Sequence, residues 1–260
     1  MFSETDLIIF RTKTVKGSEH YSKQKEGVVK KMIVLILTIF VLTAPLMAQE
    51  GFKGRPITNN LWSPTAHTLH KNEFAIGIGP VAVGLSENVQ VSTNLFLWLF
   101  QIYNANMKVS LVKSGNMSVA AGLQYQRFDL ASLFEDGDVA FNSISPFLAF
   151  TTSIGQSTDL HIAGKYSYFS SDSDIEDVEA EGSASGTEIM GGIEHSMSHK
   201  TKLLADIGYY ITFEGFRAGV GVLFGWEKFR LKLGVGYFDP KNAENAFTLP
   251  VIGLWWRFKG

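Results

Sequence analysis

The 260-residue chain contains no cysteine, only seven prolines and almost no excess of charge of either sign. The absence of cysteine excludes a disulfide framework and thiolate metal sites. A formal net charge of -2 gives no reason to expect nucleic acid or another strongly charged partner. After residue 49 the sequence also lacks a sustained helical period and any run of 18 apolar residues. This part of the chain is therefore unlike a helical bundle or a helical membrane protein.

One strongly apolar segment lies near the start of the sequence, at residues 30–48. It consists of two lysines, an apolar core, Pro45 and a small residue at Ala48, which is the layout of a secretory signal peptide cleaved after Ala48. The alternative is a membrane anchor, but Pro45 ends the apolar run before the about 20 residues that a spanning helix needs. Residues 1–29 are polar and aperiodic, and we expect an untranslated or non-native extension. The predicted organisation is an extension at 1–29, a signal peptide at 30–48 and one β-domain at 49–260.

Strand-like alternation fills the predicted β-domain. In "KFRLKLGVGYF", residues 228–238, Phe229, Leu231 and Leu233 share one face, and charged residues and glycines share the other. A period of two is the mark of a strand with two different faces. Similar runs predict eleven strands, near 74–83, 88–97, 105–113, 117–128, 140–154, 159–169, 185–196, 200–213, 216–226, 228–238 and 247–258. A twelfth is expected at 57–67, where Pro64 makes a poor strand.

The breaks between these runs alternate between short turns and a set that includes long ones, such as 128–138 and 169–186. Transmembrane β-barrels have this asymmetry of short and long connections. A soluble sandwich or barrel also alternates, but here the apolar face has aromatic residues near the strand ends and the other face is rich in glycine. We therefore predict an all-β fold, a closed antiparallel transmembrane β-barrel of about twelve strands, with ten as the alternative.

The final run, "IGLWWRFKG", carries a recognisable pattern. Gly253 is followed by aromatic residues at alternating positions, Trp256 and Phe258. This resembles the C-terminal signature of bacterial outer-membrane β-barrel proteins, although two further residues follow Phe258; it matches no named subfamily. The resemblance implies a location in the bacterial outer membrane, contact with outer-membrane lipid and lipopolysaccharide, and the barrel-assembly machinery as a partner during biogenesis.

The inward face is the best guide to function. By alternation its candidate lumen-lining residues are Lys108, Gln124, Lys165, Glu188, Glu194, Lys202, Asp206, Arg217, Arg230 and Lys232. Buried charges need partners or water. The charges either pair across the lumen and plug it, or line a narrow aqueous path whose excess of lysine and arginine favours anions. The expected function is correspondingly a narrow pore for small solutes or a structural barrel.

An acidic run offers an alternative function. The residues Asp172, Asp174, Glu176 and Asp177 are predicted to lie in a solvated outer loop at 169–186 that captures cations weakly or binds a partner, as in a surface interaction or adhesion-type barrel. The run does not fit a calcium loop of the EF-hand type, because Asp177 stands where glycine is required. We expect no resident metal, no cofactor, no nucleic-acid partner and a monomer.

The sequence offers only weak evidence for a cluster of catalytic residues. The stretch "EHSMSHK" contains Glu194, His195, Ser196 and His199, but it is predicted to be a strand end followed by a turn, where the two histidines need not converge. His161 is likewise interpreted as lumen lining rather than a general base. The chain is therefore not predicted to be an enzyme, and a barrel enzyme acting on lipid or peptide is the less favoured alternative.

Overall fold

The computed structural model describes residues 56–129, 137–175, 178–212, 214–240 and 246–259. The predicted extension and signal peptide lie outside these residues. No helix in the described part of the chain is long and apolar enough to cross a membrane. The elements are β1 (Phe74–Ile78), β2 (Pro80–Gly84), β3 (Val89–Asn94), α2 (Leu95–Trp98), β4 (Ile102–Ser114), β5 (Met117–Asp129), β6 (Gly137–Ile154), β7 (Thr158–Ile175), β8 (Val178–Ser198), β9 (Thr201–Tyr210), β10 (Gly215–Gly225), β11 (Phe229–Asp239) and β12 (Phe247–Phe258).

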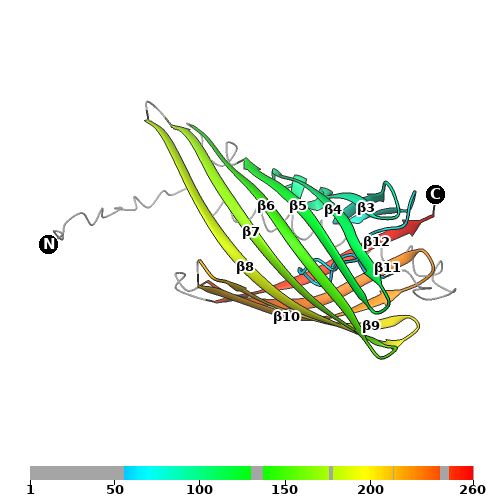
Figure 1. The fold of residues 1–260 in the computed structure, drawn as a ribbon. Coiled ribbons are helices and arrows are strands. Elements are labelled where there is room, and N and C mark those ends of the chain that lie inside the picture. The colour runs from blue at the N-terminus through cyan, green and yellow to red at the C-terminus, as the bar shows by residue number, and fades with distance from the viewer. Residues whose placement is uncertain (1–55, 130–136, 176–177, 213, 241–245, 260) are drawn as a thin grey trace, which may run out of the picture. The chain divides into compact units, whose positions relative to one another are not determined.

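These twelve strands form one closed antiparallel barrel (Figure 1). Each strand pairs with its neighbours in sequence, and β1 closes the ring by pairing with β12 from Phe74↔Phe258 to Ile78↔Leu254. Closure leaves no open edge of the sheet along the paired residues. The predicted fold class is therefore confirmed, with twelve strands rather than ten.

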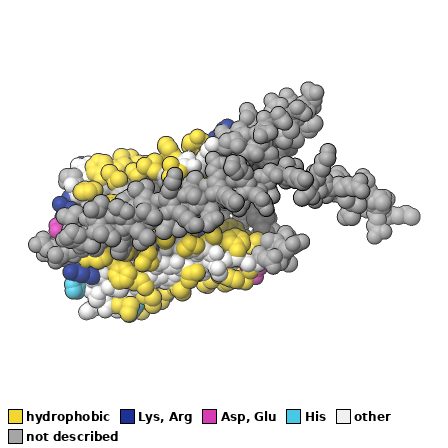
Figure 2. Space-filling view, turned by 180° about the vertical axis from the view of Figure 1, so that it is seen from behind, with side chains coloured by type: hydrophobic (Ala, Val, Ile, Leu, Met, Phe, Trp, Pro, Cys, Tyr) yellow, Lys and Arg dark blue, Asp and Glu magenta, His cyan; other side chains and the backbone are white. Residues whose placement is uncertain are grey.

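The strands present apolar side chains on the outside of the barrel. Ile162 on β7, Ile207 on β9 and Val220 on β10 are 57%, 58% and 56% exposed. Hydrophobic side chains cover most of the described outer surface in view, and charged side chains show near its two ends (Figure 2). A soluble protein rarely exposes an apolar surface of this extent, whereas a lipid-facing barrel requires one.

The wall of the barrel is uneven in height. The strands β6, β7 and β8 have 18, 18 and 21 residues, whereas β1, β2 and β3 have 5, 5 and 6. We call the first group the tall wall and the second the low wall; the tall wall projects beyond its neighbours at one end (Figure 1).

The predicted loop at 169–186 is wrong for most of its length. β7 continues to Ile175 and β8 begins at Val178, with an unbroken register that includes Ser170↔Ser183. Hydrogen bonds between strand backbones do not require apolar side chains. A search for alternating hydrophobicity therefore does not detect this part of the two strands. Asp172 and Asp174 thus belong to β7, and their side chains, like the whole of Glu176 and Asp177, lie outside what the structure describes.

The predicted first strand is two strands. The run 74–83 breaks at Gly79, whose φ of 117° is accessible to glycine, and Pro80 follows. The two halves form the tight β1–β2 hairpin. The expected strand at 57–67 is wrong: this segment is not part of the wall, and its backbone bonds to residues that face the lumen.

Candidate functional site

A segment of the chain just before β1 fills part of the lumen. We call residues 57–70 the plug. Asn60 N donates to Ser63 O at 2.9 Å and Thr65 N donates to Thr58 O at 3.3 Å, so the plug folds back on itself as a tight turn. Most of its side chains are buried. Its polar backbone must therefore be satisfied by the barrel.

A carboxylate from the wall holds the tip of the plug. Asp206 Oδ2 accepts from Trp62 N at 2.7 Å and from Ser63 N at 2.8 Å. Asp206 Oδ1 accepts from Asn60 Nδ2 at 2.6 Å. Charged acceptors make the stronger class of hydrogen bond, and Asp206 is only 3% exposed. Asp206 is thus the main anchor of the plug tip.

Two lysines hold plug carbonyls from other sides of the lumen. Lys108 Nζ donates to Thr58 O at 2.6 Å and to Thr65 O at 3.1 Å. Lys232 Nζ donates to Asn60 O. The plug is therefore bound to β4 and β11 as well as to β9.

Glycines make room for the aromatic tip of the plug. A Cβ on Gly219 or Gly236 would collide with the ring of Trp62. The ring contacts Phe238 edge-on, with 5.2 Å between centroids, and the Arg217 guanidinium lies 5.8 Å above it. The alternating glycines of β10 and β11 thus form the seat of Trp62.

Ion pairs occupy the lumen side of β7 to β10. Glu188 Oε2 lies 2.8 Å from Lys165 Nζ, and Glu188 Oε1 lies 2.6 Å from Arg217. Glu194 is paired with Lys202 and is itself only 1% exposed. We call this region, with these five residues, the ionic half of the lumen. Pairing makes buried charges tolerable.

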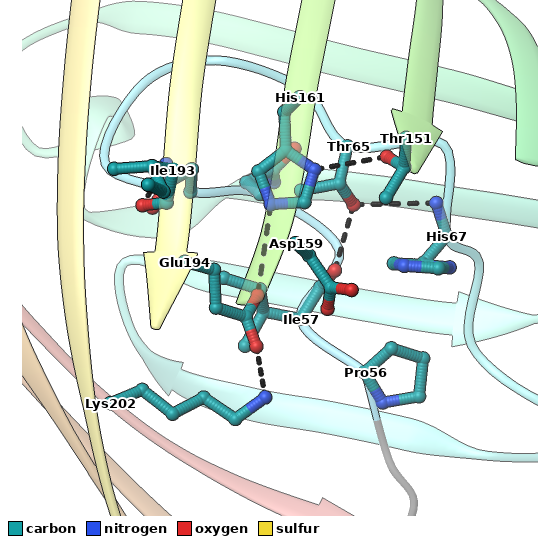
Figure 3. A network of polar contacts seen from close by, with 12 residues as sticks. Pro56, Ile57, Thr65, His67, Thr151, Asp159, His161, Ile193, Glu194 and Lys202 are labelled. Carbon is teal, nitrogen blue, oxygen red and sulfur yellow. Dashed lines mark hydrogen bonds and ion pairs between the residues drawn. The ribbon is translucent and has the colours of Figure 1, made fainter. Parts of the chain in front are cut away.

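A polar network joins the ionic half to the plug (Figure 3). His161 Nε2 lies 3.8 Å from Glu194 Oε2, and His161 Nδ1 lies 3.0 Å from Thr151 Oγ1. Thr151 Oγ1 in turn accepts from Ala66 N of the plug at 2.9 Å. Thr151, His161 and Glu194 are each buried. The arrangement is covered by the plug and serves to bind it.

The plug carries one titratable group beside this network. Burial, and to a smaller extent the nearby charges of His161 and Lys108, lower the pKa of the His67 imidazole to about 4 against the raising effect of Asp159 and Glu194. His67 is therefore neutral near pH 7. Its protonation disfavours the inserted plug.

A cavity of about 470 Å³ remains beside the plug. One side of it is lined by carboxamides from β3, β4 and β5, which we call the amide half of the lumen: Gln90, Asn94, Asn104, Asn106, Gln124 and Gln126. The basic lining residues are Arg217, Arg230, Lys232 and Arg257. None of the described lining residues is acidic. Carboxamides both donate and accept, so the cavity suits a polar or anionic guest.

The ten predicted lumen residues are divided among these regions. Gln124, Arg217, Arg230 and Lys232 line the cavity. Lys108 and Asp206 hold the plug, and Lys165, Glu188, Glu194 and Lys202 form ion pairs of the ionic half. That these residues line a solute path stays a prediction.

The other predicted residues lie elsewhere. Gly253, Trp256 and Phe258 belong to β12, and their recognition by an assembly machinery stays a prediction. His195 bonds Thr158 near a turn, whereas Glu194 faces the lumen, so the "EHSMSHK" residues do not converge.

The sequence reasoning missed the plug. Its clearest signal is the stretch "ITNNLWSPTAHT", which is rich in small polar residues around Pro64 and lacks alternation. Such a stretch offers many side-chain hydrogen-bonding groups and a poor strand. The sequence alone predicts a poor twelfth strand here, because no local pattern indicates that the segment inserts into a lumen.

The solved structures with similar folds are bacterial outer-membrane barrels, the class that the sequence resembles. They include the KdgM porin in complex with disordered oligogalacturonate (10% identity, 72% of this chain and 96% of that chain, TM-score 0.45). The attachment invasion locus protein Ail of Yersinia pestis shares 14% identity over 72% of this chain and 99% of that chain, with a TM-score of 0.34. Outer-membrane expressed OmpT of Vibrio cholerae shares 15% identity over 69% of this chain and 64% of that chain, with a TM-score of 0.38. These scores carry no argument about function. No family model and no curated protein matches the chain.

Proposed function

We propose that the protein is a monomeric bacterial outer-membrane barrel, exported by the signal peptide at 30–48, that passes small anionic solutes when its plug moves. A closed barrel pairs the backbone groups of its strands with one another along most of the wall, as strands in lipid require. The apolar outer surface supports the same location. In this proposal the plug keeps the barrel closed at rest.

The observation that carries the proposal is the charge of the cavity. Four basic side chains and no acidic side chain are found among its described lining residues, and Leu61 and Trp62 of the plug form part of its surface. Side chains of one sign lining a narrow path select ions of the opposite sign. Arg217 pairs with Glu188 and Arg257 pairs with Glu73, so the preference for anions rests mainly on Lys232, which is held by carbonyls of the plug. A small anion is therefore the favoured solute.

A surface interaction function is the second candidate. The tall wall projects at one end, and the β7–β8 hairpin is its longest part (Figure 1). A projecting hairpin presents side chains to a partner without using the lumen. We propose no catalytic role.

Single-channel recording in planar bilayers tests the proposal, with protein purified from the outer membrane of an expression host. Wild-type protein is expected to be silent or to open rarely. Asp206→Ala removes three hydrogen bonds that hold the plug tip. We expect this variant to give discrete conductance steps with anion preference.

A matched variant controls for damage to the ion pairs. Lys165→Met removes a lumen cation whose described ion pair is with Glu188 of the wall, while Arg217 still pairs with Glu188. We expect Lys165→Met to stay as silent as the wild type. A correctly folded Asp206→Ala barrel that never conducts contradicts the pore and leaves the structural or surface-interaction barrel.

A further inference from the structure

The low wall is too short to cover a membrane. Five residues at about 3.3 Å each, tilted by about 40°, rise about 13 Å. The apolar band of an outer-membrane barrel is about 25 Å tall. The strands β1, β2 and β3 thus span about half of such a band. Beyond the β1–β2 turn at Gly79, no described strand continues the wall between β12 and α2, and we call this place the gap.

One side of this gap is a bare strand edge. β11 pairs with β12 from Phe247 to Trp256, whereas β1 pairs with β12 only from Leu254 onward. Within the described part of the chain, residues 247–253 therefore have a paired strand on one side only. Bare backbone groups are not tolerated against hydrocarbon, so this edge must face water or a polar group.

The other side of the gap is closed by side chains. Asn94 N donates to Asn104 Oδ1 at 2.7 Å, and Asn104 Nδ2 donates to Asn94 O at 3.0 Å. Leu95 N donates to Gly79 O at 3.0 Å, so α2 is fixed to the top of the low wall. The gap is a defined opening between β12 and α2.

Apolar side chains border the opening on its outside. Leu99 and Phe100, which follow α2, are 74% and 54% exposed, and Ile252 of β12 is 58% exposed. Exposed side chains of this kind suit contact with acyl chains. The opening therefore lies among lipid-facing residues.

The lumen cavity extends to this opening. Its lining includes Ile78, Gly79 and Pro80 at the top of the low wall, Leu97 of α2, and Ile252. The same cavity reaches Lys232, whose ammonium lies 5.7 Å above the ring of Trp255. One continuous site thus joins an apolar mouth at membrane depth to a basic, amide-lined interior. Its volume is in the range of about 300–1,000 Å³ that is typical of ligand sites.

From this arrangement we infer that the cavity binds a single-chain anionic amphiphile from the membrane. Its acidic head lies near Lys232 and the carboxamides, and its acyl chain leaves through the gap past Leu97 and Ile252. The inference rests on the membrane location proposed above, and it deepens the proposed solute class from small anions to anions that carry an acyl chain.

The charge pattern selects this ligand over a neutral lipid. The described lining contains no carboxylate. Of its four basic side chains, Arg217 and Arg257 are paired with Glu188 and Glu73, whereas Lys232 bonds neutral plug carbonyls, so an anionic head is favoured over a cationic one. Carboxamides of the amide half can donate to a carboxylate or phosphate oxygen.

Photo-crosslinking of the purified full-length mature protein in neutral detergent tests the inference. The probe is dodecanoate with a diazirine at the end of its chain. Adducts mapped by mass spectrometry are expected on Leu97 and Ile252 at least tenfold above those on Ile162 and Val220, which are exposed on other strands. The same chain with an alcohol in place of the carboxylate is expected to label all four sites evenly.

Competition and variants separate the head from the chain. Unlabelled dodecanoate is expected to suppress the labelling at the gap, whereas butanoate at the same concentration is expected to have little effect. Lys232→Met is expected to reduce labelling at the gap about tenfold, and the control Lys165→Met is expected to leave it unchanged. Because the competition uses wild-type protein, it decides the question even where Lys232→Met fails to fold.

Two results overturn the inference. Even labelling of Leu97, Ile252, Ile162 and Val220 by the acid means that the gap is ordinary lipid-facing surface. Equal competition by butanoate means that only the anionic head binds. Neither result touches the conductance test, so the proposed pore stands or falls separately.

Discussion

The ionic half and the amide half of the lumen bury polar side chains in different ways. In the ionic half, Glu188 and Glu194 are each 1% exposed and are paired with cations from neighbouring strands. In the amide half, neutral side chains such as Gln124 and Asn106 line an open cavity. Fixed charge pairs require a tightly packed region, whereas amides tolerate a space that water or a guest fills.

Wall height accounts for only part of the difference. The ionic half involves strands of 10 to 21 residues, whereas the amide half lies on β3, which has six residues, and on β4 and β5, which have 13 each. Beside the low wall, the neutral polar groups of β3 avoid an unpaired charge near hydrocarbon.

The largest expected effect comes from breaking the ionic half. Glu188→Gln leaves Lys165 and Arg217 without their carboxylate. Removing one partner of a buried ion pair lowers the free energy of unfolding by about 3–5 kcal/mol. Urea unfolding followed by the shift in gel migration on heating measures it. A loss below about 1 kcal/mol would mean that water already screens these charges.

A smaller effect is expected from filling the seat of Trp62. Gly236→Ala places a methyl group against the indole ring, and overpacking of this kind costs about 1–3 kcal/mol. The control is Gly164→Ala, where no atom lies within 4 Å of the added Cβ. Thermal unfolding followed by tryptophan fluorescence should separate the two variants. Equal stability of the two variants would mean that the ring of Trp62 does not pack against Gly236.

The amide half should respond least in stability. Gln124→Leu replaces a neutral side chain that lines the cavity. We expect a change in the free energy of unfolding below about 1 kcal/mol, because the net contribution of a hydrogen bond between uncharged groups is about that large. The same urea experiment checks it. A loss as large as that of Glu188→Gln would abolish the distinction between the halves.

The pH dependence of the plug sharpens the comparison further. The pKa of His67 is about 4 in the inserted plug, against 6.5 for a free imidazole. Above pH 6.5 the imidazole is neutral in both states, so the plug has its full stability there. This stabilisation is lost as the pH falls from 6.5 to about 4, because only the released plug then binds the proton. Channel openings should therefore become more frequent over this range. The groups facing His67 are His161, Asp159, Glu194 and Lys108, so His67→Gln should weaken the dependence but not abolish it.

The wall could be predicted from the sequence because alternation is a local signal. The stretch 228–238 predicts β11 to within one residue at either end. The β1–β2 turn was missed although Gly79 and Pro80 are a turn signal, since five-residue strands are shorter than the window in which alternation is judged. The extension of β7 was missed because serine and aspartate carry no apolar period.

The site could be predicted only in part. Alternation places Lys232 and Asp206 on the inward face, but their partners are plug residues 143 to 173 positions away in the sequence. Such contacts depend on the closed ring and on the insertion of 57–70. Gly219 and Gly236 likewise indicate that the interior is crowded near them, but the sequence does not identify Trp62 as the side chain that fills this space.

Cysteine labelling of the plug tests the central claim most directly, and the chain's lack of native cysteine makes each introduced thiol unique. Ser63→Cys replaces a plug residue that is 1% exposed, and Asn116→Cys places a thiol in the exposed β4–β5 turn. The reagent is a water-soluble maleimide applied to the folded protein. We predict that Cys at 116 reacts rapidly, that Cys at 63 stays unreactive, and that adding Asp206→Ala makes Cys at 63 reactive. Rapid labelling at 63 in the otherwise unaltered barrel would contradict a plug held in the lumen.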